Sequence, residues 1–384
     1  MTFTNFAFSA PNSIHFGRGT CDLAANLAAG FGRSVLLVHG ANPKRADWLL
    51  TQCADAGLKV ETIGCAGEPD LPLLETALPR FKETPPDLII ALGGGSVMDF
   101  AKALAALIPC EGPPRAYLEG VGDGRTLDTA PLPVIALPTT AGTGSEVTRN
   151  AVITVPDRGI KVSLRDPRMI PRVAIVDASL MESAPRTVKL SAALDAVTQA
   201  IEPYLSTKAN PMTDALCLAA IPVGLSALKP LIEENSAEAM DEMAWVSTCG
   251  GLALANGGLG AVHGFAGVIG GMTNAPHGEI CGTLLPAVLA SHRARADADS
   301  EIARRTGWVV SIISDIFGSA EQTDGLQALQ DWSRAQGLRG LSAIGLSSES
   351  YGQTAELSAQ ASSMKANPFL LSIEELTDIL TKAA

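Results

Sequence analysis

Short apolar runs alternate with amphipathic segments through the first half of the chain. The pattern predicts strands within residues 34–40, 59–64, 87–95, 132–140 and 173–179, and helices within 43–57, 71–83 and 96–107. Strands that alternate with helices in this way form a parallel sheet flanked by helices. The first half is therefore predicted to be an α/β domain.

The pattern changes after about residue 185. Long Ala-rich segments with helical periodicity follow at 190–206, 212–234 and 239–258, and no further strand is predicted. The predicted fold class is α/β plus all-α, with a parallel-sheet domain at 1–185 and a helical domain at 186–384. A cleft between two such domains is the expected place for a small-molecule site.

The charge of the chain argues against several kinds of partner. Its 28 basic and 40 acidic residues give a formal net charge of −12. Nucleic acids and acidic membrane surfaces need a basic footprint, so neither is expected as a partner. No apolar stretch predicts a membrane-spanning helix, and the N-terminal residues lack the pattern of a signal peptide. Seven scattered cysteines without a CxxC pair favour reduced thiols and a cytoplasmic protein.

A glycine-rich turn joins a predicted strand to a predicted helix at GGGSVMDFAK, residues 93–102. Gly94 and Gly95 allow the backbone to approach a phosphate closely. Ser96 is predicted to cap the helix with Asp99 as its capping-box partner, and N–H groups at a helix start suit a pyrophosphate. The segment is not a GxGxxG fingerprint, so an ordinary strand-to-helix turn is the alternative.

A second segment, Leu132–Thr154, begins as a strand and opens into a loop rich in hydroxyl groups and glycine. It carries Thr139, Thr140, Thr143 and Ser145, whose hydroxyls could bond a ribose or a nicotinamide amide. The alternative is a polar loop whose hydroxyls bond their own backbone.

Four residues form a candidate metal site. Asp195 and Gln199 lie four apart in a predicted helix, which places both on one helical face. His263 and His277 lie in glycine-rich surroundings. A carboxylate, an amide oxygen and two imidazoles together could hold one divalent ion such as Fe²⁺ or Zn²⁺. Histidines that serve only as core or surface residues are the alternative.

These motifs resemble the iron-containing (group III) alcohol dehydrogenase family, whose fold is shared with glycerol dehydrogenase and dehydroquinate synthase. The resemblance extends over the whole chain and includes GGGSVMDFAK, ALPTTAGTGSEVT, AIVDASL, VHG followed by NAPHG, and NPFLLSIEEL. It implies a dinucleotide-binding domain, a helical domain and a metal held by an Asp and three His. Asp195, His263 and His277 match three of those ligands and are also the expected catalytic residues.

Two positions depart from the family pattern. Gln199 stands where the fourth ligand is usually His, and Gly267 stands where the family often has a histidine that relays protons. Asp195, Gln199 and two neutral imidazoles leave a divalent ion with a net charge of +1, as the usual set does. The Lewis acidity that stabilises an alkoxide is therefore expected to survive, although an amide oxygen is a weaker donor than imidazole.

The choice of dinucleotide depends on the end of the first predicted strand. The family often has an Asp there that repels a 2′-phosphate, whereas this chain has Gly40 followed by Lys44 and Arg45. NADP is therefore favoured over NAD. The expected cofactor-binding residues are Gly40, Gly94, Gly95, Ser96, Asp99, Thr139, Thr140, Thr143, Ser145 and Lys161.

The sequence thus predicts a metal-dependent oxidoreductase that transfers a hydride between a small alcohol or aldehyde and NAD(P). The main alternative is a metal-independent reductase of the same fold, similar to maleylacetate reductase. A synthase like dehydroquinate synthase, or a nucleotide-binding protein without catalysis, are further alternatives. A homodimer or higher oligomer is expected, because the family resemblance implies that an N-terminal strand near Phe3, Phe6, Phe8 and Phe16 pairs across a subunit interface.

Overall fold

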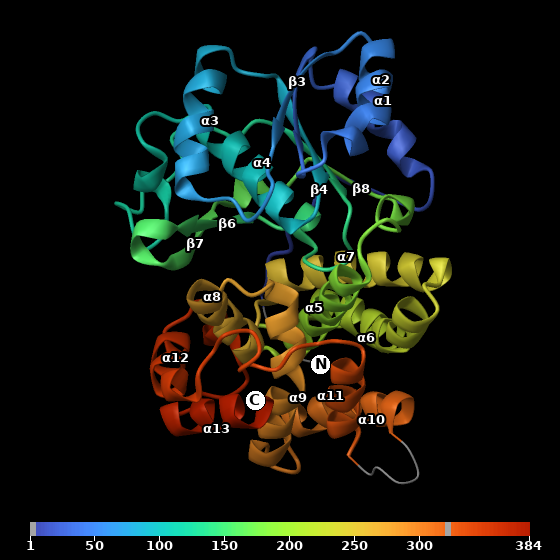
Figure 1. Cartoon of the computed structure of the whole chain (residues 1–384), viewed down its shortest axis with the longest axis vertical. Coiled ribbons are helices and arrows are strands. Elements are labelled where there is room, and N and C mark those ends of the chain that lie inside the picture. The colour runs from blue at the N-terminus through green and yellow to red at the C-terminus, as the bar shows by residue number, and fades with distance from the viewer. Residues whose placement is uncertain (1–4, 319–323) are drawn as a thin grey trace. The chain divides into compact units, whose positions relative to one another are not determined.

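The computed structural model describes residues 5–318 and 324–384, and these form two compact units (Figure 1). One unit consists of Ser9–Thr140 with Gly144–Ser183. The other consists of Ala184–Ala384 with Ala141–Thr143 and the start of the chain up to Phe8. The main division thus falls close to residue 185, where the sequence pattern changes.

The first unit contains a six-stranded parallel sheet in the order β1-β8-β5-β4-β2-β3. The predicted parallel sheet is therefore confirmed. The strands are β1 (Ser13–Phe16), β2 (Ser34–His39), β3 (Lys59–Gly64), β4 (Leu88–Gly93), β5 (Val134–Pro138) and β8 (Val173–Val176).

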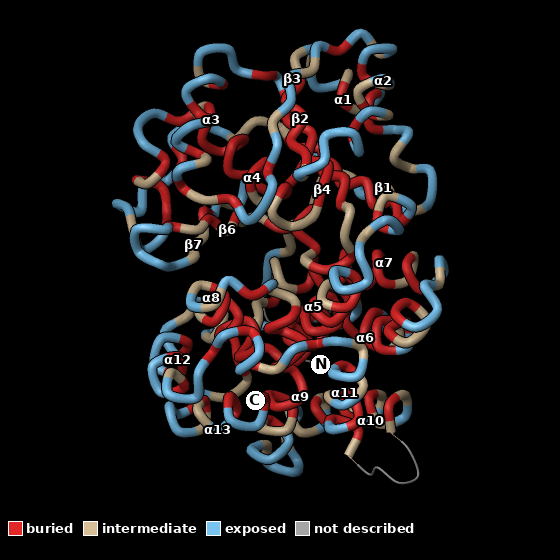
Figure 2. The backbone as a smooth tube through the Cα atoms, viewed as in Figure 1, coloured by how far each residue is buried: buried red, intermediate tan, exposed pale blue. Residues whose placement is uncertain are grey.

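Helices cover both faces of this sheet because its central strands are apolar on both sides. Val35 and Leu37 of β2 pack with α1 (Ala24–Ala29) and α2 (Asp47–Asp55), whereas Leu36 and Val38 pack with α3 (Leu71–Glu83) and α4 (Gly95–Leu107). Successive side chains of a strand point to opposite faces, so one continuous apolar run supplies two cores. Figure 2 shows the resulting buried centre of the unit.

An antiparallel hairpin follows the hydroxyl-rich loop and is absent from the sequence prediction. It consists of β6 (Asn150–Val155) and β7 (Ile160–Arg165). Its turn contains Gly159 in the left-handed conformation (φ 62°), which favours glycine. Alternate residues of β6 are buried, as expected for a half-buried strand. The polar residues before and after this short alternation concealed it.

The second unit is helical, and its described residues contain no strand. The predicted helical half is therefore confirmed. Its helices are α5 (Arg186–Leu205), α6 (Pro211–Glu233), α7 (Ala237–Gly257), α8 (Ala261–Thr273), α9 (His277–Arg295), α10 (Glu301–Phe317), α11 (Gly325–Ala335), α12 (Tyr351–Ala359) and α13 (Ile373–Ala383). Short 3₁₀ turns lie at Thr20–Leu23, Pro43–Ala46, Pro114–Tyr117, Ser145–Val147, Pro156–Arg158, Pro167–Met169, Ala178–Leu180, Ser348–Ser350 and Ser363–Ala366.

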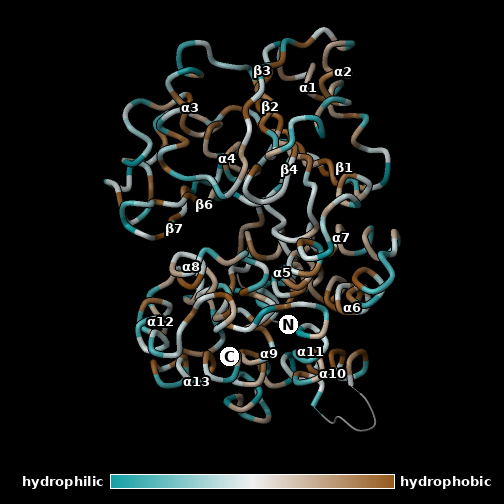
Figure 3. Tube along the Cα trace, in the orientation of Figure 1, coloured by the Kyte–Doolittle hydropathy of each residue, from teal (hydrophilic) through white to brown (hydrophobic). Residues whose placement is uncertain are grey.

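Helix α6 meets the length and apolarity of a membrane-spanning helix, which corrects the expectation that every apolar stretch is too short or too interrupted. Figure 3 shows how hydropathy varies along this unit. Half of the most apolar window of α6 is buried, and the helix packs against α5 and α7. This packing accounts for the apolar composition, because a helix with apolar residues on several sides is typical of a protein core.

Helix α5 is the central element of the helical unit. It packs against α6, α7 and α9, and all of its residues from Ala193 to Leu205 are buried. Three of these buried residues carry carboxylate or amide side chains and lie on one face at spacings of four and three: Asp195, Gln199 and Glu202. A polar row inside a core needs partners, and these partners define the site.

Candidate functional site

The glycine-rich turn lies between β4 and α4. Helix α4 begins at Gly95 with Gly94 as its N-cap, and no side chain caps it. The predicted cap by Ser96 is therefore wrong, because Ser96 already lies inside the first turn. A Cβ atom at Gly94 would lie 3.1 Å from Thr140 Oγ1, and a Cβ atom at Gly93 would collide with Val97. The compact turn leaves the first N–H groups of α4 in position to donate hydrogen bonds to an anion.

Asp99 joins this helix to the hydroxyl-rich loop instead of completing a capping box. Its carboxylate accepts hydrogen bonds from Ser145 Oγ at 2.8 Å and from the Val152 N–H at 3.0 Å. The buried Lys102 ammonium donates to Ser145 O, Ser145 Oγ and Thr148 Oγ1 at 2.6–3.1 Å. Burial lowers the pKa of Lys102, and the charge of Asp99 opposes that shift. Asp99 and Ser145 are thus engaged in holding the loop.

The other predicted cofactor-binding residues occupy varied settings. The Thr139 N–H donates to Gly93 O at 2.9 Å, at the end of the sheet where the glycine turn begins. Gly40 follows β2, and a Cβ atom there would meet nothing within 4 Å. Lys161, on β7, forms an ion pair with Glu68 at 2.5 Å.

Thr143 belongs with Ala141 and Gly142 to the helical unit. A Cβ atom at Gly142 would lie 2.9 Å from Ala192 Cβ of α5, so this part of the loop packs closely on α5, one turn before Asp195. The loop therefore contributes residues to both units.

Among the described residues, one group of His, Cys, Asp and Glu side chains has the geometry to hold a metal ion: Asp195, His263, His277 and Cys281. One ligand atom from each lies within 4.8 Å of all the others. Asp195 Oδ1 is 3.5 Å from His263 Nε2 and 3.8 Å from His277 Nε2. The structure thus brings together Asp195, His263 and His277 of the predicted ligands.

Three helices supply these side chains. Asp195 lies in α5, His263 lies in the first turn of α8, and His277 is the first residue of α9. Helix α9 approaches α5 closely because its contacting residues are glycines. A Cβ atom at Gly278 would lie 2.3 Å from Ser191 O, and one at Gly282 would lie 2.7 Å from a Leu194 side-chain carbon. The glycines around His277 therefore allow the two helices to share one site.

Glu202 determines how His263 is presented. Its Oε2 atom lies 2.6 Å from His263 Nδ1, and its two oxygens accept the Val262 and His263 backbone N–H groups at 2.7 and 3.4 Å. The carboxylate therefore caps α8, where a negative charge is favourable. It also holds the proton on Nδ1 and turns Nε2 toward Asp195, as carboxylates do behind metal-bound histidines. A Cβ atom at Gly260 would lie only 2.9 Å from Glu202 Oε1, so the close approach needs glycine.

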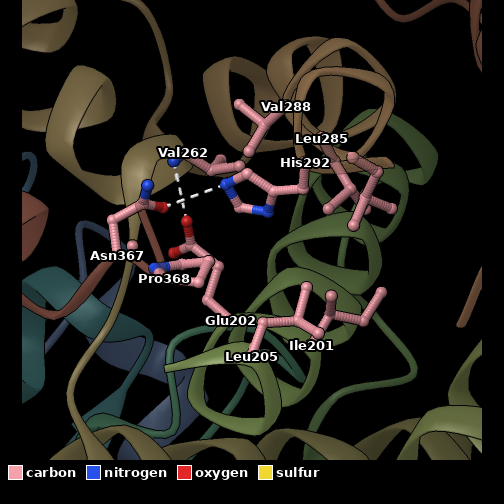
Figure 4. Close-up of a pocket in the computed structure, with 11 residues that line it drawn as sticks. Ile201, Glu202, Leu205, Val262, Leu285, Val288, His292, Asn367 and Pro368 are labelled. Carbon is pink, nitrogen blue, oxygen red and sulfur yellow. Dashed lines mark hydrogen bonds between the residues drawn. The ribbon is translucent and has the colours of Figure 1, made fainter. Parts of the chain in front are cut away.

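A small, mostly apolar pocket lies beside this carboxylate (Figure 4). In it, Asn367 Oδ1 lies 3.1 Å from His292 Nε2 and also accepts the Ala261 N–H at 3.1 Å. Burial lowers the pKa of His292 to about 4, so this imidazole is neutral near pH 7. Asn367 and His292 thus support the start of α8 on the side where Glu202 lies.

The cluster has an electrostatic character that suits a cation. Burial raises the pKa of Asp195, but the charge of His277 and a hydrogen bond from His263 outweigh burial and lower it. A hydrogen bond from Gln199 lowers the pKa of Asp195 further. Burial lowers the pKa of His277, whereas the charges of Cys281 and Asp195 raise it to about 9. Acidic groups therefore dominate the field and attract positive charge.

The residues present fit a divalent metal. Asp195 Oδ1 and Gln199 Oε1 are buried without a hydrogen-bond partner among the described residues, a costly arrangement unless another group binds them. His263 presents Nε2 because Glu202 engages Nδ1. Carboxylate, imidazole and thiol donors are the usual ligands of zinc, and zinc and iron both bind imidazole.

The sequence prediction missed Glu202, Cys281, His292 and Asn367. Two of them carried a signal: Glu202 lies seven residues after Asp195 on the same helical face, and Cys281 lies four residues after His277. Asn367 begins the NPFLLSIEEL motif, but its role and that of His292 depend on the contact between the C-terminal segment and α9, which the sequence does not encode.

Comparison with known proteins gives two family matches. A model described as iron-containing alcohol dehydrogenase matches residues 11–178, and one described as the C-terminal part of the Fe-containing alcohol dehydrogenase family matches residues 189–384. Together they cover most of the chain.

Individual relatives agree with these matches. Lactaldehyde reductase of Escherichia coli (strain K12) is 35% identical over 249 residues, 65% of this chain and 64% of its own length. NAD-dependent methanol dehydrogenase of Bacillus methanolicus is 32% identical over 307 residues, 79% of this chain and 78% of its own length. The crystal structure of a 1,3-propanediol oxidoreductase superimposes with a TM-score of 0.88 at 26% identity, covering 99% of this chain and 100% of that one.

The close approach of α9 to α5 leads to a prediction about Gly278. In Gly278→Ala the added methyl group would collide with Ser191 O and move His277 away from Asp195. We expect metal affinity to fall by about 10–100-fold, as for other residues that orient metal ligands. Competition with a chromogenic chelator measures this affinity.

Gly307→Ala is the matched control, because Gly307 lies in α10 of the same unit and a Cβ atom there meets nothing within 4 Å. This variant should keep its metal affinity, with a stability change of at most about 1 kcal/mol. Equal affinity in Gly278→Ala and Gly307→Ala would contradict the importance of helix spacing.

Proposed function

The chain belongs to the iron-containing alcohol dehydrogenase family, and on that premise we propose that it is a metal-dependent oxidoreductase acting on a small alcohol or aldehyde with NAD(P). The observation that carries the proposal is the cluster of Asp195, His263 and His277. These residues come from three helices, and their ligand atoms lie within 4.8 Å of one another. The assembled cluster also makes a metal-independent reductase the less favoured alternative.

The metal would be held by Asp195, His263 and His277, with the oxygen of Gln199 as a weaker candidate donor. When bound, a divalent ion supplies Lewis acidity that lowers the pKa of a substrate hydroxyl. Glu202 keeps His263 in the tautomer that presents Nε2, and Gln199 orients the Asp195 carboxylate through its hydrogen bond. These residues prepare the donor atoms before any ligand arrives.

The cofactor would be held by the glycine turn and the hydroxyl-rich loop. N–H groups from Gly95 onward at the start of α4 suit the pyrophosphate. Thr139, Thr140 and Thr143 would orient the ribose and nicotinamide, with Asp99 and Ser145 acting indirectly by fixing the loop. Gly267 offers no side chain to carry a proton, so the proton would leave through water or a ribose hydroxyl.

A panel of small alcohols and aldehydes, assayed with NAD(H) and NADP(H) on protein of measured metal content, tests this function. We expect turnover of at least one pair that increases with metal occupancy. Tight NADPH binding with no turnover of any substrate would instead support a nucleotide-binding protein without catalysis.

The His277 imidazole provides a direct test of the metal. His277→Ala removes one ligand from the cluster, so we expect metal to be lost on dialysis and kcat/KM to fall by more than about 100-fold. Elemental analysis and steady-state kinetics measure the two effects. His15→Ala, in β1 of the other unit, is the control and should retain both. Full activity of metal-depleted His277→Ala would show that catalysis does not need the metal.

We propose NADP(H) as the preferred cofactor because no carboxylate follows β2. Gly40→Asp introduces a negative charge into open space, where it would repel a 2′-phosphate and accept a ribose hydroxyl. The ratio of kcat/KM for NADPH over NADH should fall about tenfold, equivalent to about 1.4 kcal/mol. Lys44 is exposed, so its contribution would be below the roughly 1.5–3 kcal/mol of a desolvated charged bond.

Gly40→Asn is the control, since it has nearly the same shape without the charge and should leave the ratio closer to that of the natural protein. A natural protein that strongly prefers NADH would contradict the assignment. It would mean that another residue determines the preference between NAD(H) and NADP(H).

We also propose a homodimer that pairs through β1. This strand lies at one edge of the sheet, and Ile14 and Phe16 on it are exposed. An edge strand with exposed apolar side chains is a ready site for pairing with another chain. Phe6 is exposed as well, whereas Phe3 lies outside the described residues. Light scattering at micromolar concentration should give twice the chain mass, and a monomeric mass would contradict the proposal.

A cytoplasmic location is proposed on the state of the thiols. All seven cysteines are free in the structure, as expected for a protein kept in a reducing compartment.

A further inference from the structure

We propose that Cys281 is the fourth protein ligand of the metal. It would take over the role of the histidine that the family usually has at the position of Gln199, and the site would consequently prefer zinc to iron. The inference rests on the proposed metal-dependent function and specifies the ligand set of its site.

The positions of the ligand atoms carry this proposal. Cys281 Sγ lies 3.7 Å from His277 Nε2 and 3.9 Å from His263 Nε2. With metal–ligand distances of 2.0–2.3 Å, two ligands of a tetrahedral ion lie roughly 3.4–3.6 Å apart. The separations of Asp195 Oδ1 from the two imidazoles are 3.5 and 3.8 Å, so one lies in this range and the other slightly above it. The four atoms therefore have nearly the spacing that one tetrahedral ion requires.

The helix geometry explains why Cys281 can reach this position. His277 and Cys281 lie four residues apart in α9 and project from the same face toward α5. Gly278 and Gly282, on the face that packs against α5, let the two backbones approach closely. Cys281 is fully buried, so its thiol meets the other ligand atoms without competition from bulk water.

A buried cysteine is often only a small apolar residue. The surroundings of Cys281 differ from that case, because a carboxylate and two imidazoles converge on its sulfur. Within the described part of the chain, no other cysteine joins three such groups. Gln199, by contrast, offers a buried amide oxygen, which is a harder and weaker donor toward zinc than a thiolate.

The chemistry of the site follows from this ligand set. Binding of the metal releases the thiol proton to solvent, since the thiolate is the ligand. Asp195 and Cys281 then contribute two negative charges, which neutralise a divalent ion. With the Asp195 carboxylate as the only anionic ligand, the site would keep a net charge of +1. A thiolate is a softer ligand than imidazole and favours zinc within the Asp, His, His and Cys set.

Reconstitution of the metal-depleted protein with Co²⁺ tests the ligand directly. We expect a thiolate-to-cobalt charge-transfer band in the near-ultraviolet spectrum, and a zinc–sulfur distance of about 2.3 Å by X-ray absorption of the zinc form. Zinc should bind at least about tenfold more tightly than Fe²⁺ in chelator competition.

Variants separate Cys281 from the other thiols. Cys281→Ser should lose the band and bind zinc at least about tenfold more weakly, whereas Cys217→Ser, a buried thiol of α6, should keep both. The double variant Cys281→Ala with Gln199→His restores a set of Asp and three His. It should recover metal binding without the band.

The outcomes distinguish this proposal from the proposed function. Metal bound at one ion per chain, with neither the band nor a sulfur neighbour in the natural protein, would overturn the role of Cys281 and leave the metal-dependent function intact. Failure to bind any divalent metal would overturn both. The spectra of the natural protein decide the question even if Cys281→Ser does not fold.

Discussion

The site depends on one buried carboxylate. Glu202 lies in the central helix of the helical unit, where an unpaired charge would be costly, and it accepts hydrogen bonds from two backbone N–H groups and one imidazole. The same atoms therefore begin α8, fix the orientation of His263 and satisfy the charge. Asn367, from the C-terminal segment, completes the start of α8, and His292 of α9 holds Asn367 in turn.

Glycine has a similar importance for the distances between helices. Imidazole, carboxylate and thiol donors on different helices reach one ion when those helices pack directly against one another. The absence of a side chain at Gly260 leaves room for the Glu202 carboxylate. The absence of side chains at Gly278 and Gly282 lets α9 pack closely against α5. The glycine-rich surroundings of the two histidines are thus required for the packing of the site.

In the α/β unit a buried cation, the Lys102 ammonium, positions the residues around the glycine turn. Lys102 gathers the hydroxyls of Ser145 and Thr148, and Asp99 balances its charge while binding Ser145 and the backbone of β6. This network joins the helix after the glycine turn to the hydroxyl-rich loop. The residues that resemble cofactor ligands in the sequence therefore divide into those that present backbone or hydroxyl groups and those that hold the loop.

The sequence by itself determined the order and type of most elements, because long runs with period 2 or 3.6 report local burial directly. It also predicted the clustered trio of Asp195, His263 and His277, because the glycine-rich surroundings of the histidines and the family resemblance pointed to these residues. It misplaced the start of α4 and missed the β6–β7 hairpin, whose short polar–apolar alternation resembled a loop. Only the tertiary structure added Cys281 and Glu202 to the site. Their roles depend on how closely α5, α8 and α9 approach one another, and side-chain distances between helices are set by packing, which periodicity along a chain does not encode.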